Sequence, residues 1–100
     1  MPFHNIVDTS RNGKTGVRRE WGDWCNVDGA AFGRLPAASD EAYVDAFVWA
    51  KAGGDSDGTS DTSAVRYNSY CGKVDAFKPM PEAGVWSAAY FEMMLRSSTL

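Results

Sequence analysis

The chain has 100 residues, 44% of them hydrophobic, and carries 13 acidic and 10 basic side chains for a net charge of −3. This is the composition of one ordinary globular domain, or of part of one. The negative charge and the scattered basic residues do not attract phosphate backbones, so we expect no nucleic acid partner. We expect no membrane segment, because no apolar stretch approaches the ~20 residues of a spanning helix. The first residues lack the basic start and apolar core of a signal peptide.

Two short segments are predicted as strands. Residues 3–9 have Ile6 and Val7 at their centre and precede a turn-forming cluster, which predicts a short buried strand. Residues 46–50 (AFVWA) predict a second strand, which the glycine pair at 53–54 ends. Residues 14–36 follow no sustained period of 2 or 3.6, which predicts a long irregular segment between the strands. Connections of that length tend to be functional.

The rest of the chain predicts helical turns and a polar loop. Residues 39–41 (SDE) are suited to cap a short helical turn, and residues 55–63 are small and polar, which predicts a loop outside any core. From Pro81 to Ser98 the apolar residues recur at helical spacing, which predicts a C-terminal helix. We expect Trp86, in this helix, and Trp49, in the second strand, to lie in the core.

These elements form a small inventory for a stable domain. Two strands, one helix and two long polar loops bury little apolar surface, whereas a sheet needs three or more strands or a covering helix. The sequence therefore predicts a piece of something larger.

The two cysteines, Cys25 and Cys71, are 46 positions apart and match no CxxC metal or redox pattern. Their spacing is equally consistent with a disulfide and with two separate buried thiols. A disulfide closing this loop would contribute about 4 kcal/mol to stability.

The acidic loop after the second predicted strand is the first candidate site. Asp55 and Asp57 follow a strand that ends in Lys51, and active sites of α/β proteins collect at the carboxyl ends of strands. A calcium-binding EF-hand is excluded, because the sixth and twelfth positions counted from Asp55 hold serine and arginine. The alternative is that Asp55, Asp57 and Asp61 are turn and capping residues.

A pair of tryptophans is the second candidate site. Trp21 and Trp24 lie in a glycine-bearing loop, where a ring is well placed to stack on a flat apolar face such as that of a pyranose. The alternative is a small core under the loop, pinned by Cys25. The lone His4 has no partner at metal-ligand spacing, so we assign it no role and expect no metal site.

The absence of GxSxG, HExxH, P-loop and GxGxxG motifs leaves carboxylate chemistry as the remaining enzymatic interpretation. Carboxylates, lysine and tryptophan together are the groups that glycoside hydrolysis uses: acid, base, hydrogen-bond donor and stacking platform. Carboxylates and water suffice for this chemistry, so no cofactor is implied.

Five runs of sequence, in order, resemble the C-terminal part of glycoside hydrolase family 6: IVDTSRNG (6–13), EWGDWCN (20–26), DAFVWAKAGGDSDGTSD (45–61), RYNSYCG (66–72) and PEAGVWSAAYFEMML (81–95). The family comprises secreted cellulases, both cellobiohydrolases and endoglucanases, that cleave β-1,4-glucan with inversion. The resemblance implies an α/β fold, a distorted parallel (TIM-like) barrel, of which residues 1–100 are the C-terminal segment of the catalytic domain. It also implies an extracellular location and a β-1,4-glucan or cello-oligosaccharide partner.

The resemblance also assigns residues to roles. Lys51 and Asp55 match the family's lysine and acid that bind the sugar beside the scissile bond. Asp57 falls at the position proposed as catalytic base, a role disputed within the family. Trp24 matches a tryptophan that stacks on glucose, and Trp21 the one beside it.

The two cysteines match a family disulfide, so the resemblance favours a Cys25–Cys71 bond. The chain departs from the family pattern at Asp55, where glutamate is usual, and at Ala52, where proline is usual. The family's proton donor lies upstream of the matched region, and inversion needs an acid and a base about 6.5–9.5 Å apart. We therefore expect the isolated chain to be inactive without the N-terminal part of the barrel. A non-catalytic glucan-binding module and a gene fragment without function are the alternatives.

Overall fold

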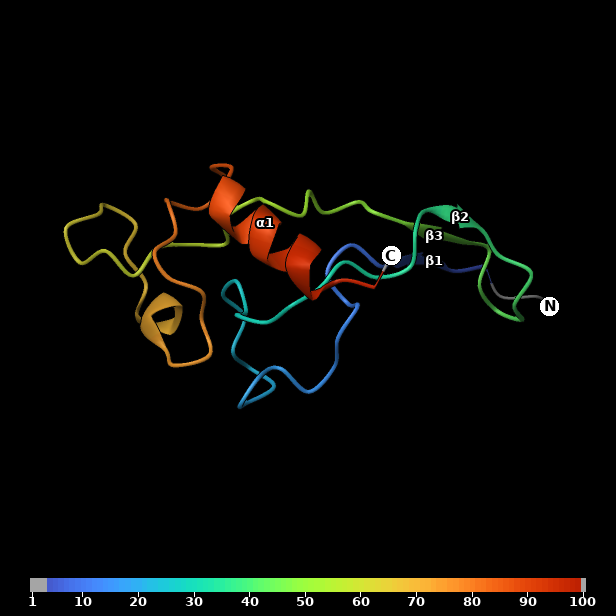
Figure 1. Cartoon of the computed structure of the whole chain (residues 1–100), viewed down its shortest axis with the longest axis horizontal. Coiled ribbons are helices and arrows are strands. Elements are labelled where there is room, and N and C mark those ends of the chain that lie inside the picture. Colours follow the sequence, from blue (N-terminus) through green and yellow to red (C-terminus); the bar gives the residue numbers. More distant parts are fainter. Residues whose placement is uncertain (1–3, 100) are drawn as a thin grey trace.

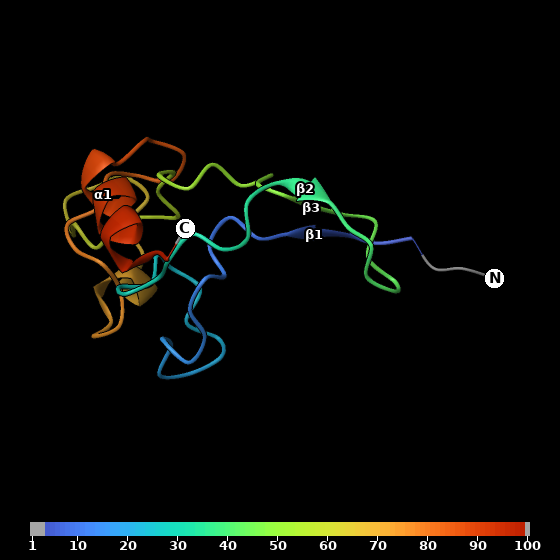
Figure 2. The same ribbon diagram turned by 45° about the vertical axis from the view of Figure 1, so that its right-hand side comes forward.

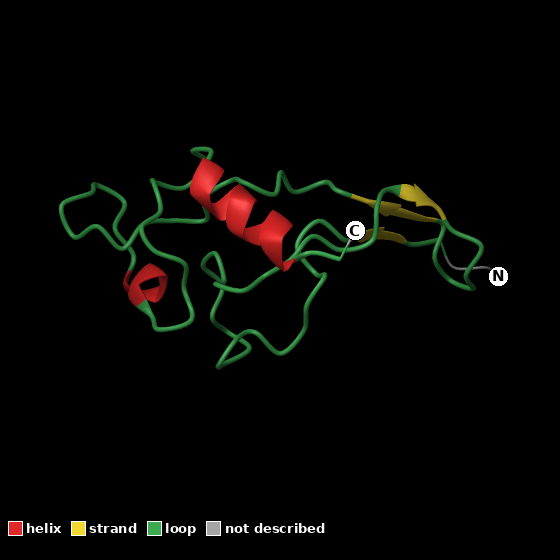
Figure 3. Cartoon of the chain, in the orientation of Figure 1, coloured by secondary structure: helices red, strands yellow, loops and turns green. Residues whose placement is uncertain are grey.

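The computed structural model describes residues 4–99. Its elements, in chain order, are β1 (Ile6–Asp8), β2 (Ala37–Ala38), β3 (Ala46–Val48), the 3-10 helix η1 (Ser69–Gly72) and α1 (Ala88–Ser97). Loops form most of the chain (Figure 3). The radius of gyration is 14.9 Å, above the ~13 Å of a compact 100-residue domain. The molecule is elongated because the sheet projects away from α1 and η1 (Figures 1 and 2).

The sheet has the strand order β1-β3-β2. β1 runs parallel to β3, with Ile6 opposite Ala46 and Asp8 opposite Val48, and β2 pairs with β3 in the antiparallel sense. Parallel pairing brings the carboxyl ends of β1 and β3 to the same edge of the sheet. The Thr9 amide continues the pairing by donating to the Val48 carbonyl oxygen at 2.8 Å. The loops that follow these two strands therefore start side by side.

Both strand predictions are confirmed in position and wrong in extent, and the first is also wrong in burial. The first predicted strand is reduced to Ile6–Asp8, and its expected start at Phe3 lies outside the described residues. Ile6 is 68% exposed, so the expected burial is wrong: no other layer of residues 4–99 covers β1. The second strand ends at Val48, before Trp49. β2 was not predicted, because two alanines carry no periodic signal.

The predicted C-terminal helix is present, but it begins at Ala88 and not near residue 81. The preceding residues pair with the acidic loop: Ser56 N donates to Val85 O at 2.9 Å, and Ser87 N donates to Gly54 O at 2.7 Å. The Ser87 side chain then caps the helix by accepting from the Tyr90 amide. Residues 39–41 were expected to cap a short helical turn. Ser39 Oγ does accept from the Glu41 amide at 3.0 Å, but a single turn follows, in which the Val44 amide donates to the Glu41 carbonyl oxygen at 3.3 Å, and no helix forms.

The main core lies between α1 and the irregular segments that pack on it. Its buried members are Ala30, Phe32, Met80, Tyr90 and Met94, with Trp49, Phe77, Phe91 and Met93 packed against them. The predicted core position of Trp49 is confirmed, since its ring stacks on Phe32 with centroids 4.9 Å apart. The prediction for Trp86 is wrong: it precedes the helix and is 51% exposed.

The acidic loop is more buried than predicted. Ser56 is 1% exposed and Thr59 is 3% exposed, although a polar loop outside the core was expected. The Ser56 hydroxyl donates to the Pro81 carbonyl oxygen at 2.6 Å and accepts from the Gly58 amide at 3.1 Å. Small polar side chains are buried without penalty when backbone groups satisfy them in this way.

The elements are those of an α/β protein, a mixed sheet of three strands and one α-helix within residues 4–99. They do not by themselves close into a barrel. None of the helices in the described part of the chain is long and apolar enough to span a membrane.

Candidate functional site

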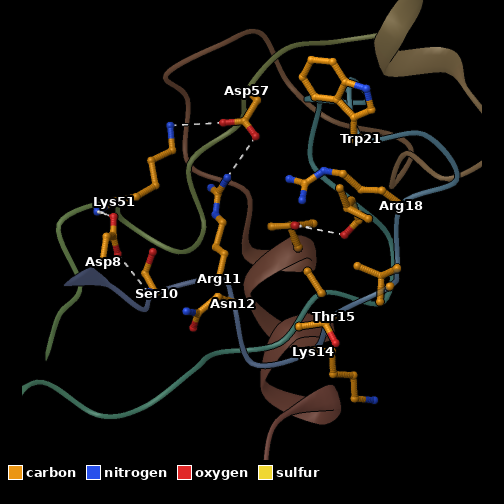
Figure 4. A pocket seen from close by; sticks show the side chains of 15 residues that line it. Asp8, Ser10, Arg11, Asn12, Lys14, Thr15, Arg18, Trp21, Lys51 and Asp57 are labelled. Atoms are coloured by element: carbon orange, nitrogen blue, oxygen red, sulfur yellow. Dashed lines mark hydrogen bonds and ion pairs between the residues drawn. The ribbon is translucent and has the colours of Figure 1, made fainter. Parts of the chain in front are cut away.

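A cavity of about 600 Å³ opens at the sheet edge where β1 and β3 end. The loop after β1, the loop after β3, the irregular segment at 14–21 and α1 all contribute to its wall (Figure 4). The residues of interest that line it are Asp8, Arg11, Trp21, Lys51, Asp57 and Tyr90. Three of the residues predicted from sequence, Trp21, Lys51 and Asp57, are thus brought to one cavity.

Asp57 lies between two cations at the wall of this cavity. Lys51 Nζ is 3.1 Å from its Oδ1, and Arg11 Nη1 is 3.0 Å from its Oδ2. The Asp57 side chain is 19% exposed, and its amide donates to Asn26 Oδ1. Figure 4 shows Lys51 and Arg11 pointing toward Asp57, with Trp21 across the cavity from Lys51. Each carboxylate oxygen has two lone pairs, so one on each oxygen remains for a water or a sugar hydroxyl.

Arg11 organises the whole acidic loop. Its Nε donates to the Gly53 carbonyl oxygen at 3.2 Å, and its Nη2 donates to the carbonyl oxygens of Ala52 at 3.2 Å and of Asp55. The guanidinium also lies over the Tyr90 ring, 5.3 Å from its centroid. One planar side chain with five donors therefore fixes the backbone from 52 to 55 and the Asp57 carboxylate together.

Asp8 performs a similar task for Lys51. Its two carboxylate oxygens accept from the Ser10 amide at 2.9 Å and the Lys51 amide at 3.1 Å. Partial desolvation raises the pKa of Asp8, but these two amides, together with the Ser10 side chain and the Ala50 amide, outweigh it and hold that pKa below its ordinary value. Asp8 stays ionised in mildly acidic solution and keeps the start of the acidic loop tied to the end of β1.

Sequence reasoning gave no role to Asp8 or Arg11. The signal that could have found them is their place at the end of β1 (Asp8) and just after it (Arg11), which resembles the place of Lys51 after β3. The resemblance implies parallel strands but does not say which strands are neighbours. The pairing of β1 with β3, which brings both sets to one edge, was not predicted.

Asn26 joins the tryptophan loop to the acidic loop. It is 1% exposed, and its Nδ2 donates to the Asp55 carbonyl oxygen at 3.0 Å while its Oδ1 accepts from the Asp57 amide. The carboxylate of Asp55, in contrast, makes no hydrogen bond or ion pair within residues 4–99, and Asp55 is not among the residues that line the cavity. The structure therefore places Asp55 next to the cavity and not in its wall.

The two loop tryptophans differ in their surroundings. Trp21 is 97% exposed, so a small core under the loop is excluded for it. Trp24 lies outside the cavity wall, is 44% exposed and stacks on Tyr70 with centroids 6.0 Å apart and an interplanar angle of 26°. Gly58 packs under it, since a Cβ there would lie 3.7 Å from the Trp24 ring and 2.8 Å from Cys71 Sγ.

The two cysteines form the disulfide that the resemblance favours, with the Cα atoms 5.2 Å apart. It connects the residue after Trp24 to the 3-10 helix η1. His4, for which no role was predicted, pairs with Asp45 at 3.0 Å on the surface. No cluster of three or more His, Cys, Asp or Glu side chains within residues 4–99 could hold a metal ion.

Comparison with known proteins places the chain in one family. The profile of glycosyl hydrolases family 6 matches residues 1–98. The 1,4-beta-D-glucan cellobiohydrolase CEL6C of Podospora anserina is 67% identical over 99 residues, which is 98% of this chain and 25% of that protein. The chain therefore spans about a quarter of the length of this relative.

Solved structures agree with this assignment. The catalytic core domain of the cellobiohydrolase Cel6A from Chaetomium thermophilum matches with a TM-score of 0.88 at 57% identity, covering 94% of this chain and 27% of that one. The cellobiohydrolase II (Cel6A) of Humicola insolens, in complex with glucose and cellotetraose, matches with a TM-score of 0.86 at 54% identity, covering 93% and 26%.

Proposed function

We propose, since this chain belongs to glycosyl hydrolases family 6, that it is the C-terminal segment of the catalytic domain of a secreted enzyme that hydrolyses β-1,4-glucan with inversion. Its three strands and helix would complete a distorted parallel α/β barrel whose remaining strands come from the rest of the protein. Relatives named as cellobiohydrolases and exoglucanases support the proposed hydrolysis of β-1,4-glucan. Structures of relatives with cello-oligosaccharides support a cello-oligosaccharide as the ligand of this segment.

The observation that carries the proposal is the arrangement around Asp57. This carboxylate stands at a cavity wall, fixed by Lys51 and Arg11 at 3.1 and 3.0 Å. As catalytic base it would take a proton from the attacking water through a lone pair that the two cations leave free. The acid that protonates the leaving oxygen must stand on the opposite face, about 6.5–9.5 Å away, on another part of the barrel.

The remaining predicted residues would hold the sugar. Lys51 Nζ has three protons and uses one on Asp57, so it can also donate to a sugar hydroxyl. Trp21 and Trp24 present exposed ring surface for stacking on glucosyl units. Among residues 4–99 the Asp55 carboxylate has no partner, and it lies beside the cavity, where a sugar hydroxyl can bind it. The disulfide supports secretion, because such bonds persist in oxidising compartments.

The test of the base is substitution in the full-length enzyme. Asp57→Ala and Asp57→Asn should lower the rate of β-1,4-glucan hydrolysis by about 100-fold or more. Asp61→Asn is the matched control, because the Asp61 carboxylate lies on the same loop and, in the described part of the chain, bonds only Ser63. It should retain activity. Wild-type turnover in both Asp57 variants would remove Asp57 from the mechanism.

A second experiment tests the segment itself. We expect the reading frame to continue upstream of the Met1 codon and to encode further strands and an acidic proton donor. The isolated 100 residues should release no sugar from cello-oligosaccharides. Cooperative folding of the isolated chain with oligosaccharide binding would favour the binding-module alternative, and a stop codon directly upstream would contradict the proposed enzyme.

A further inference from the structure

The Trp24 ring is linked through Tyr70 to two further side chains, Lys73 and Asp23. Its ring stacks on Tyr70, and Lys73 Nζ lies 4.5 Å from the centroid of the same Tyr70 ring. Lys73 Nζ is also 2.8 Å from Oδ1 of Asp23, the residue that directly precedes Trp24. The Asp23 side chain is 7% exposed and that of Lys73 is 37% exposed, so the carboxylate is shielded from water and the ammonium group only in part. The Lys73 ammonium group therefore contacts both the ring on which Trp24 stacks and the residue that precedes Trp24.

The disulfide alone does not fix the orientation of the Trp24 ring. Cys25 and Cys71 follow Trp24 and Tyr70 directly in the chain, so their bond brings the two backbones together. The plane of the indole still depends on rotation about its two side-chain torsions. Contact with a second ring and a fixed cation over that ring limits this rotation.

We propose that Lys73 is a positioning residue that, through Tyr70 and Asp23, sets the plane of the Trp24 ring and thereby the affinity for a glucosyl unit of the β-1,4-glucan. This rests on the proposed function, in which Trp24 stacks on sugar. Trp24 is 44% exposed, so the ring surface that Tyr70 leaves uncovered is open to a ligand. A ring held in its binding orientation loses less conformational freedom when the sugar binds.

The charges of Asp23 and Lys73 are stable in acid. The hydrogen bond from Lys73 lowers the pKa of Asp23, and the same bond raises the pKa of Lys73. Glu20 lies 3.8 Å from Lys73 Nζ and is 75% exposed, so it adds a weaker attraction. Both partners thus remain ionised in mildly acidic solution.

The test uses cellotetraose binding and hydrolysis by the full-length protein. Lys73→Met keeps most of the stem but removes the charge, and should raise the Kd and KM about threefold to tenfold while kcat changes less than twofold. Lys73→Arg should restore binding to within twofold of wild type. Lys78→Met is the control, since it makes the same charge change on the same segment. Among the described residues, Lys78 Nζ bonds only the backbone carbonyl oxygens of residues 73 and 76. This variant should bind as wild type does.

A second pair of variants covers the case in which Lys73→Met fails to fold. Tyr70→Phe keeps the ring and should bind normally, whereas Tyr70→Leu should weaken binding as Lys73→Met does. Trp24→Ala separates the two proposals. If Trp24→Ala weakens binding but Lys73→Met and Tyr70→Leu do not, only the positioning role is overturned. If Trp24→Ala leaves the Kd unchanged, the sugar-stacking role fails and the positioning role fails with it.

Discussion

Replacing Arg11 by methionine should destabilise the protein more than any change at an exposed arginine. The substitution removes the 3.0 Å ion pair to Asp57 and the donors to the carbonyl oxygens of Gly53, Ala52 and Asp55. The Arg11 side chain is 18% exposed and that of Asp57 19%, so water replaces these bonds only in part. Removing one partner of a fully buried pair costs 3–5 kcal/mol, and for this partly shielded pair we expect about 3 kcal/mol.

Urea unfolding of the full-length enzyme measures this loss. Arg96→Met is the matched control: Arg96 reaches Glu92 at 4.0 Å, four residues earlier on α1, and the two side chains are 73% and 66% exposed. Such surface pairs contribute about 0.5 kcal/mol or less. Arg11→Lys keeps the charge but not the planar fork, so its stability should fall between Arg11→Met and wild type. Equal destabilisation by Arg11→Met and Arg96→Met would refute the view that Arg11 holds the acidic loop together.

Three further predictions concern the backbone, the helix cap and acid. Gly54→Ala should lower stability by about 1–3 kcal/mol, because its Cβ would lie 2.6 Å from a tryptophan ring. Gly22 has open space around it, so Gly22→Ala should not lower stability. Thermal denaturation compares the two variants. Ser87→Ala should cost about 1 kcal/mol by removing the N-cap of α1, and unchanged unfolding would show that water serves the free amides equally well. Lys73 lowers the pKa of Asp23 below its ordinary 3.8, so the stabilisation is complete above about pH 5 and is lost as pH falls through the lowered pKa. The decrease in melting temperature from pH 5 to pH 2.5 should accordingly be smaller in Lys73→Met than in wild type.

The sequence predicted the elements that depend on local pattern. The apolar centre of β1 and the AFV part of the AFVWA run are present as strands, and the spacing of Tyr90 and Met94 is that of the buried face of α1. Local pattern did not predict the elements whose bounds depend on pairing with distant residues. The helix starts at Ala88 and not at 81 because residues 85 and 87 bond to the acidic loop instead. Two alanines form β2 only because β3 is beside them.

The residues of the candidate site also differ in whether the sequence alone could select them. Residue type and the family resemblance alone were enough to select Asp57 and Lys51, because carboxylate and ammonium groups after a strand are a chemical signal that needs no coordinates. Asp8 and Arg11 were not selected, since their importance lies in contacts across 43 and 46 positions of sequence. Only the tertiary structure brings those positions together: the parallel pairing of β1 with β3 sets the loops side by side, and the planar guanidinium of Arg11 reaches three carbonyl oxygens and one carboxylate at once.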